Sequence, residues 1–408
     1  MFASLVSVGS SVFCLSLSNS ASRRTVLYLD HNATTPCDPE VVAAMAPYWS
    51  EVFANPSQRG HRPGLAAAVA VDQARQTVAD ALGVTPSQVI FTSGATEADN
   101  LAIKGLCEQR LGQGRHLVTV ATEHAAVLEP CRYLERLGFA LTVLPVRADG
   151  RLELAALAAA LRPDTVLVSV MAANNEIGVL QDVEAVAALC RQRGIAYHCD
   201  AAQACGHVPL DPTGWGVDLL SLSGHKFYGP KGVGALLVRP GLALAPQLHG
   251  GGQEGGYRSG SLSPPLIVGL AKALTLALRD QRSRGQRLRA LREELWSGLN
   301  GLRLPPGVEL LRNGCPAHSL PHTLNVTVRG VDGARLHGRL RRRVALSSGS
   351  SCSSASGKPS HVLRALGRSS AEAGASLRFG LGRGVTAADV DRTVAAVQDA
   401  LPLAATVS

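Results

Sequence analysis

The chain has 408 residues, of which 46% are hydrophobic, and its formal net charge is +9. This length and composition allow a large buried core, in two domains or in one large domain with a smaller partner. Aromatic residues are only 4% of the chain and no run of 18 apolar residues occurs, which argues against base-stacking nucleic-acid sites and against a membrane span.

Much of the positive charge is concentrated in two segments. Six arginines lie between residues 279 and 292, where Leu288, Leu291 and Leu295 recur at helical spacing, and four more lie between residues 339 and 343. A helix with a solvated arginine face explains the first segment better than nucleic-acid binding does. We therefore expect no nucleic-acid partner.

The nine cysteines are odd in number and form no CxxC pair or CxxC…HxxxH spacing. This pattern argues against a disulfide framework and against a structural zinc site, so we expect no metal ligands. It is typical of a reducing, intracellular setting, and the cytoplasm is the simplest expectation.

Residues 1–24 are rich in serine, contain no acidic residue, and carry their first basic residues at Arg23 and Arg24. A secretory signal would carry positive charge before its apolar part, whereas here the charge follows it. An organellar transit peptide and an unstructured extension both fit this composition.

The first predicted elements are a short strand at residues 26–29 and a polar tail at residues 30–36 that could face a pocket. A helix is predicted to begin near Pro39, capped by Asp38 or Thr35. A longer helix follows, from about Leu65 to Leu82.

Strands and helices then alternate along the chain. Apolar or β-branched runs predict strands at residues 89–92, 116–121, 141–146, 165–171, 195–199, 217–222 and 233–238, with helices between most of them. Such alternation predicts the α/β class, with a mostly parallel sheet covered by helices on both faces. Polar residues follow many of these strands, at the edge where open α/β sheets bind ligands.

Ser93 to Glu97 form a glycine-containing turn from a strand into a helix. Free backbone N–H groups and the helix dipole make such a turn a phosphate site, with the Thr96 hydroxyl as an extra donor. The same turn could equally be a plain helix cap.

Three further strand ends carry side chains suited to a planar ligand. His124 could stack flat on an aromatic cofactor or be an ordinary loop histidine, and Asn174 and Asn175 could hydrogen-bond such a ligand. Asp200 ends a buried strand, where a carboxylate is costly unless a cation meets it. A protonated pyridine nitrogen would serve as that cation.

Lys226 lies in a tight turn between the strands at 217–222 and 233–238, with Ser223, His225 and several glycines around it. A lysine held among glycines and backed by apolar strands loses hydration. A desolvated amine is what imine formation with an aldehyde cofactor requires. A surface lysine in a hairpin is the alternative.

The chain divides into a residue 1–24 extension, a large domain at 25–264, and a connector helix with a small domain at 265–408. The connector is predicted from Leu266 to about Leu302. The remainder is predicted to be a smaller α+β unit, with strands at 323–328 and 344–346.

Residues 347–356 are mostly serine and glycine, which favours a mobile loop, with Cys352 in its middle. An accessible loop cysteine is a candidate nucleophile, and an irrelevant surface thiol is the alternative. Arg378 lies on an apolar strand, where an arginine usually has an anionic partner such as a substrate carboxylate.

Eight strings, in the right order, carry a family likeness: residues 28–36, 91–97, 174–178, 198–203, 223–226, 258–261, 347–356 and 376–378. They span about residues 26 to 395 and resemble the pyridoxal-phosphate-dependent cysteine desulfurases, which are similar to the selenocysteine lyases. The resemblance implies the fold type I, aminotransferase class V-like architecture, with a seven-stranded sheet, a small C-terminal domain and two active sites per homodimer.

The resemblance also implies roles for single residues. Lys226 would bind pyridoxal 5'-phosphate and move protons, Asp200 would pair with its ring nitrogen, and His124 would stack on its ring. The remaining residues expected to bind the cofactor are Ala95, Thr96, Asn175, Gln203, Ser223, His225 and, from the other subunit, Ser261.

Arg378 and Asn175 would bind the carboxylate of L-cysteine, and Cys352 would take its sulfur as a persulfide and release alanine. The long serine-rich loop resembles the branch that passes sulfur to iron–sulfur scaffolds. Ser261 stands where many relatives have threonine. The chain lacks the longer C-terminal tail with which some relatives bind a scaffold protein, which leaves the acceptor open.

The sequence leaves two other functions open. A selenocysteine lyase would carry the same motifs and would act on selenocysteine. A catalytically idle nucleic-acid or scaffold-binding protein would use the arginine-rich segments, although intact Lys226, Asp200 and Cys352 argue against it.

Overall fold

The computed structural model describes residues 26–348 and 359–405. Its largest element is a seven-stranded sheet in the order β2-β8-β7-β6-β5-β3-β4. The strands are β2 (Val89–Thr92), β3 (His116–Val120), β4 (Ala140–Leu144), β5 (Thr165–Ser169), β6 (Ala196–Asp200), β7 (Leu219–Ser223) and β8 (Gly234–Val238). β8 runs opposite to the other six strands, so its pairs with β2 and β7 are antiparallel and the remaining pairs are parallel. The predicted mostly parallel α/β sheet is confirmed.

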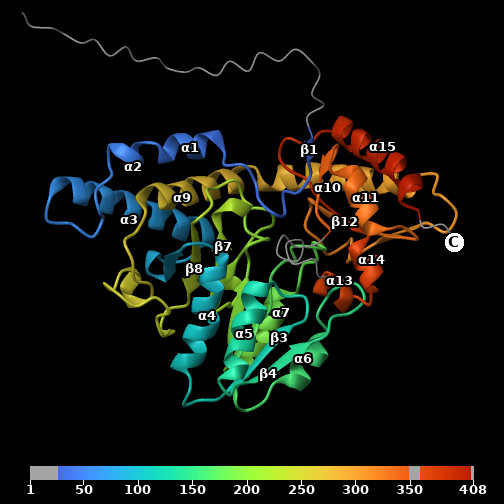
Figure 1. Cartoon of the computed structure of the whole chain (residues 1–408). Helices are drawn as coiled ribbons and strands as arrows, with labels where there is room; N and C mark the ends of the chain where they lie inside the picture. The colour runs from blue at the N-terminus through green and yellow to red at the C-terminus, as the bar shows by residue number, and fades with distance from the viewer. Residues whose placement is uncertain (1–25, 349–358, 406–408) are drawn as a thin grey trace, which may run out of the picture.

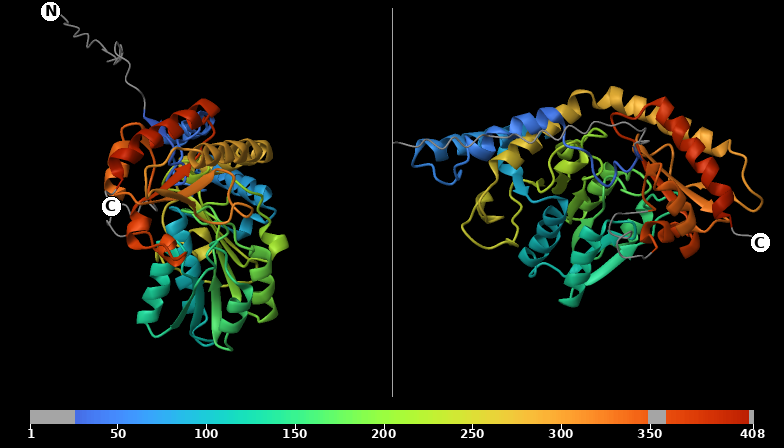
Figure 2. Two further views of the ribbon diagram at one scale, coloured as in Figure 1. Left: turned by 90° about the vertical axis from the view of Figure 1, so that its right-hand side faces the viewer. Right: turned by 45° about the horizontal axis from the view of Figure 1, so that its top comes forward.

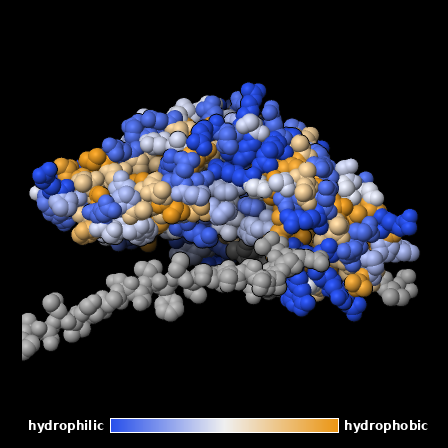
Figure 3. Space-filling view, turned by 90° about the horizontal axis from the view of Figure 1, so that it is seen from above, coloured by the Kyte–Doolittle hydropathy of each residue, from blue (hydrophilic) through white to orange (hydrophobic). Residues whose placement is uncertain are grey.

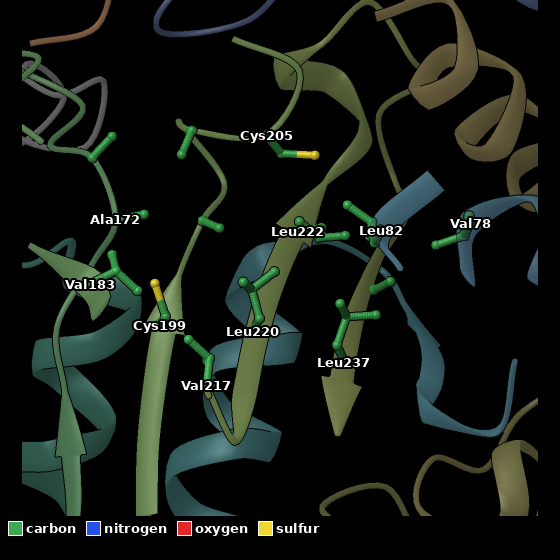
Figure 4. Packing of buried hydrophobic residues seen from close by; sticks show 14 of the residues in the cluster. Val78, Leu82, Ala172, Val183, Cys199, Cys205, Val217, Leu220, Leu222 and Leu237 are labelled. Atoms are coloured by element: carbon green, nitrogen blue, oxygen red, sulfur yellow. The ribbon is translucent and has the colours of Figure 1, made fainter. Parts of the chain in front are cut away.

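Helices cover both faces of this sheet (Figure 1). On one face α4 (Ala95–Gln109) and α5 (Ala125–Arg136) enclose a cluster that includes Leu101, Val127 and Leu236. On the other face α3 (Arg62–Leu82), α7 (Val183–Gln192) and α9 (Pro264–Arg279) enclose a second cluster. Figure 4 shows part of it, with Leu82 of α3 beside Leu237 of β8. Burial on both faces explains why these strands read as continuous apolar runs.

Shorter elements complete the large unit. They are α1 (Pro39–Met45), α2 (Pro47–Ser50), α6 (Leu154–Ala160), α8 (Pro212–Trp215), η1 (Pro86–Gln88), η2 (Gly224–Lys226) and η3 (Glu254–Gly256). Asp38 caps α1 by accepting a hydrogen bond from Glu40 N. The other predicted cap, Thr35, instead donates its hydroxyl to the carbonyl of His225.

The connector between the two units consists of two helices. α9 ends at Arg279, Asp280 leaves the helical conformation, and α10 (Gln281–Asn300) continues toward the C-terminal unit (Figure 2). The predicted single helix is therefore broken at Asp280. Among the helices of the described residues, none combines the length and the apolar character needed to cross a bilayer.

The C-terminal unit has its own sheet and core. Its strands run antiparallel in the order β12-β10-β9, and α10 packs against α15. The elements are β9 (Glu309–Arg312), β10 (Thr323–Arg329), α11 (Gly333–Leu340), α13 (His361–Ala365), α14 (Ser370–Gly374), β12 (Ser376–Gly380) and α15 (Ala387–Ala404).

The division at residues 264/265 stays a prediction, but the start of the chain does not lie wholly within the large unit. β1 (Leu27–Tyr28) pairs in parallel with β11 (Val344–Ala345). Leu29, only 1% exposed, packs in the C-terminal core. No local pattern reveals a pairing between strands more than 300 residues apart in sequence.

The predicted solvated arginine face of residues 279–292 is wrong for two of its arginines. Arg284 donates to Asp280 and to the carbonyls of Gly206 and Ala277. Arg292, only 2% exposed, donates to Ser319 Oγ at 2.5 Å and to the carbonyl of Leu320. Backbone carbonyls of both units accept hydrogen bonds from these guanidinium groups, which compensates for their burial.

Candidate active site

A cavity of about 400 Å³ opens at the carboxyl ends of β6 and β7. The sequence predicted this edge of the sheet as the ligand site, from the polar residues that follow each strand. The cavity brings together ten of the predicted site residues, namely Ala95, Thr96, His124, Asn175, Asp200, Gln203, Ser223, His225, Lys226 and Arg378.

Lys226 is half-buried at the end of the short η2 turn that follows β7. Its Nζ donates to the carbonyl of Asn32 at 2.6 Å and to that of Ala33 at 3.0 Å. The backbone after it is strained, because Tyr228 has a φ of 70° although it is not glycine. These contacts fix the amine at the wall of the cavity.

The polar tail at residues 30–36 holds this strained turn from outside. Thr35 N and Oγ both donate to the carbonyl of His225, and Thr35 Oγ accepts from Tyr228 N at 2.8 Å. The tail was expected to face a pocket. Its tight attachment to the lysine turn, about 190 residues later, was not predicted.

The N-terminus of α4 forms a corner of the cavity that is suited to a phosphate group. Gly94 precedes it with a φ of 150°, and no described side chain caps its first turn. Thr96, Ser223 and His225 line the same corner. Burial and the nearby charge of Lys226 lower the pKa of His225 to about 4, so its imidazole is neutral.

His124 is the N-cap of α5, and its Nδ1 accepts from Ala126 N at 3.1 Å. Nδ1 therefore carries no proton, and a neutral ring has its hydrogen on Nε2. Burial lowers the pKa of His124, which favours the neutral form. A neutral aromatic face thus borders the cavity.

Asp200 Oδ1 accepts from Ala202 N at 2.8 Å, and no hydrogen bond from a described residue reaches its other oxygen. Burial, and then repulsion from Asp99, raises the pKa of Asp200 to about 6. A cation placed in the cavity would reverse this penalty and keep the carboxylate ionised.

A second buried acid lies behind Asp200. Asp99 of α4 approaches His198 of β6 at 3.4 Å. His198 also contacts Ser169 and Ser221. Burial raises the pKa of Asp99 to about 7 and lowers that of His198 to about 4. The two groups therefore form a neutral pair at pH 6, with the proton on the acid.

Of the two adjacent amides, only Asn175 lines the cavity. Asn174 is 1% exposed, because its Oδ1 accepts from the backbone of Glu176 and Ile177 while its Nδ2 donates to the carbonyl of Thr122. Gln203 borders the cavity, and its Nε2 donates to the carbonyl of Asn32.

Arg378 lies on β12 of the C-terminal unit and reaches the cavity with only 1% of its surface exposed. Its Nη2 donates to Asp30 Oδ1 at 2.6 Å and its Nη1 to the carbonyl of Asn175 at 3.2 Å. Its buried Nε has no acceptor among the described residues. The pairing with Asp30 was not predicted.

Among the predicted site residues that the structure describes, Ser261 does not join this group. Ser261 is exposed and does not line the cavity. Cys352 lies outside the described residues. Five further lining residues belong to segments that were predicted to face a ligand: Asn32 and Ala33 of the polar tail, and Ser93, Gly94 and Glu97 of the predicted phosphate turn. The lining residues that were not predicted are Met171, Ala173, Ala202, Lys231 and Gly232. Within residues 26–348 and 359–405, no group of three or more His, Cys, Asp or Glu side chains could hold a metal ion.

Comparison with known proteins agrees with this geometry. A model of the family "Aminotransferase class-V" matches residues 27–393. The chain is 48% identical over 375 residues to the cysteine desulfurase IscS of Methylococcus capsulatus, which covers 91% of this chain and 92% of that protein. It is 47% identical over 379 residues to the cysteine desulfurase IscS of Escherichia coli, which covers 92% of each.

Solved structures give the same result. A NifS-like protein matches with a TM-score of 0.86 and 35% identity, over 93% of this chain and all of that one. SspA in complex with cysteine matches with a TM-score of 0.78 and 38% identity, over 87% of this chain and 99% of that one. The chain therefore belongs to the aminotransferase class-V family and, within it, to the cysteine desulfurases.

Proposed function

We propose that this protein removes sulfur from L-cysteine with the help of pyridoxal 5'-phosphate, leaving L-alanine and a persulfide on Cys352. One observation carries the proposal: a single cavity holds Lys226, Asp200 and Arg378, which are suited to an aldehyde, a pyridinium and a carboxylate.

The residues of the cavity fit the cofactor. The uncapped first turn of α4 with Thr96 and Ser223 suits a phosphate group. At the other side Asp200, buried and short of a cation, suits a protonated ring nitrogen. When bound, pyridoxal phosphate supplies an electron sink for the substrate's α-carbon.

The other side chains would bind and orient. The two carbonyls that hold Lys226 Nζ keep this amine where it can join the aldehyde and later move a proton. His124 would cover one face of the ring, and Gln203 would donate to its phenolic oxygen. Arg378 and Asn175 would hold the carboxylate of L-cysteine.

The sulfur-transfer step balances without any further reactant. The thiolate of Cys352 attacks the substrate sulfur, and the bond between that sulfur and the β-carbon breaks. The electron pair of that bond stays with the substrate, which takes up the proton that the substrate thiol gave up. L-alanine leaves, and the sulfur remains on Cys352 as a persulfide for an acceptor protein.

A homodimer is part of the proposal. Ser261 lies outside the cavity of its own chain, as expected for a residue that serves a second copy. Val42, Trp49 and Phe53, in and between α1 and α3, have exposed large apolar side chains. Figure 3 shows hydrophobic surface at this end of the molecule. Such a patch favours contact with another protein surface. We expect the acceptor to be an iron–sulfur scaffold or another sulfur carrier, in the cytoplasm.

The decisive experiment compares wild type with Cys352→Ala in the presence of L-cysteine and a reductant. Wild type should release alanine and sulfide in equal amounts, and without reductant it should gain one sulfur on the peptide that contains Cys352. The variant should keep the substrate-dependent change in cofactor absorbance and lose sulfide release.

Cys315→Ala is the control, because Cys315 is a partly exposed cysteine that does not line the cavity. It should keep full activity. Full sulfide release by Cys352→Ala would overturn the sulfur-transfer role. Activity on L-selenocysteine with none on L-cysteine would instead identify a selenocysteine lyase.

A further inference from the structure

Arg378 is bound on one side and has donor capacity left on another. Its guanidinium uses Nη2 for Asp30 and Nη1 for the carbonyl of Asn175, and its buried Nε has no acceptor among the described residues. A buried N–H group without an acceptor is costly, so this edge of the guanidinium is suited to an incoming anion. Asp30 holds the group without using up all of its five donors.

Asp30 has a second contact, on its other oxygen. Its Oδ2 accepts from Ser347 Oγ at 2.9 Å, while the carbonyl of Ser347 accepts from Arg378 N at 2.7 Å. Asp30, Ser347 and Arg378 therefore form a closed set of contacts. Three separate segments supply them: the tail after β1, the end of β11 and the strand β12.

The backbone around Asp30 is fixed as well. A β-bridge joins it to Gly380, and Gly380 N donates to the carbonyl of Leu29 at 2.7 Å. The carboxylate is 17% exposed, so both of its contacts are largely shielded from water. A carboxylate held in this way can fix the positions of the Arg378 and Ser347 side chains that bind it.

We propose that Asp30 is a positioning residue for sulfur transfer, because its two oxygens tie the carboxylate-binding guanidinium of Arg378 to Ser347, five residues before Cys352 in the sequence. The inference rests on the proposed function. In this role the Asp30 carboxylate aligns Arg378, the proposed anchor of the substrate, with Ser347, where the chain leaves β11.

The contacts separate the two halves of this role. Loss of the Asp30–Arg378 bond frees the guanidinium, which weakens substrate binding. Loss of the Asp30–Ser347 bond leaves the guanidinium held and changes only the attachment of residue 347. The first change should raise the KM for L-cysteine, and the second should lower kcat.

The test uses the full-length enzyme loaded with pyridoxal phosphate and three variants: Asp30→Ala, Asp30→Asn and Ser347→Ala. Asp30→Ala should raise the KM for L-cysteine about tenfold or more, as expected for a misplaced binding group. Asp30→Asn keeps an acceptor for Nη2 and should recover most of this loss. Ser347→Ala should leave KM near the wild-type value and lower kcat severalfold.

A binding readout without turnover accompanies the kinetics. In a Cys352→Ala background, an absorbance titration with L-cysteine should give a dissociation constant that rises with Asp30→Ala and stays unchanged with Ser347→Ala. A thermal melt of each variant separates loss of folding from loss of binding.

Asp38→Asn is the matched control, because Asp38 lies in the same N-terminal stretch and pairs with Arg383 at 2.8 Å without lining the cavity. It should change neither constant. If Asp30→Ala keeps the wild-type KM and dissociation constant, or if Asp30→Asn is as impaired as Asp30→Ala, the positioning role is wrong. Failure of the wild type itself to form alanine and sulfide would instead reject the proposed function.

Discussion

Asp99 and His198 are two buried neighbours whose pKa values both lie far from those of free side chains. The contact between them is that of an ion pair only if the histidine is charged. Burial instead lowers the pKa of His198 from 6.5 to about 4 and raises that of Asp99 from 3.8 to about 7. The pair is therefore neutral in the range where free histidine and free aspartate would both be charged.

The two shifted pKa values have opposite effects on how stability changes with pH. The folded-state pKa of His198 is depressed, so its contribution to stability is present above pH 6.5 and is lost as the pH falls toward 4. The folded-state pKa of Asp99 is raised, so its contribution is present below pH 3.8 and is lost as the pH rises toward 7. Between pH 4 and 6.5 the two effects oppose each other.

We predict that Asp99→Asn reveals the contribution of His198 to the pH dependence of the free energy of unfolding. From pH 6.5 to 4, the free energy of unfolding of this variant should fall by about 3 kcal/mol more than that of wild type, because only the opposing acid is removed. Urea unfolding of the cofactor-free protein at several pH values measures this. His198→Gln is the control and should shift the slope in the opposite direction. Parallel pH profiles for all three proteins would contradict a neutral pair.

At the same scale, the sequence could predict many of the residues that line the cavity but not their hydrogen-bond partners. Lys226 was recognisable because it follows Ser223 and His225 directly after the first strand of a strand–turn–strand pattern. The carbonyls of Asn32 and Ala33 that hold it belong to a segment about 190 residues away. Backbone acceptors carry no residue-type signal, and neither did the Asp30 carboxylate that meets Arg378.

Most elements of the large sheet were predictable because six of its seven strands are buried along their whole length; β4, at the edge, is the exception. β2 begins and ends at the predicted residues, and β6 and β8 shift by one residue at each boundary that changed. Breaks that depend on tertiary contacts were not predictable. The end of α9 at Asp280 is one of them: Arg284 of the next helix pairs with that aspartate and with carbonyls outside its own helix.

We predict that one methyl group on β8 disturbs the turn before α4, which is the proposed phosphate site. A Cβ at Gly234 would lie 2.7 Å from Gly94 Cα and would also contact the carbonyl of Leu222, both of which are backbone atoms that cannot turn away. Gly234→Ala should therefore lower stability by about 1–3 kcal/mol and weaken cofactor binding. Thermal melting and a fluorescence titration with pyridoxal phosphate measure the two effects.

Gly112→Ala is the control for this change, because nothing lies within 4 Å of a Cβ at that position. It should resemble wild type in both measurements. Wild-type cofactor affinity in Gly234→Ala would mean that the turn before α4 can move without consequence, which would weaken the assignment of this turn as the phosphate site.

For the whole molecule, the cavity depends on two units that lie far apart in the sequence. Lys226 and Asp200 come from the large sheet, whereas Arg378 comes from β12 of the C-terminal unit. The tail after β1 contacts both, through Lys226 and through Arg378. The order of the motifs along the chain could predict that these residues and the N-terminal tail converge, but only the three-dimensional fold reveals which hydrogen bonds the tail makes with each unit.

The short strand β1 should therefore stabilise the C-terminal unit more than the unit that follows it in sequence. Leu29 packs in the C-terminal core with Leu324 and Phe379. We predict that Leu29→Ala lowers stability by about 2–5 kcal/mol through the cavity that it leaves. Hydrogen exchange should increase in β10 and β12 and remain slow in β5 and β6.

Leu157→Ala, at an equally buried position in the large unit's core, should give the reverse pattern. Equal acceleration of both sheets by Leu29→Ala would mean that the two units unfold as one cooperative body, because the connector helices and the shared cavity would then couple them more tightly than their separate cores suggest.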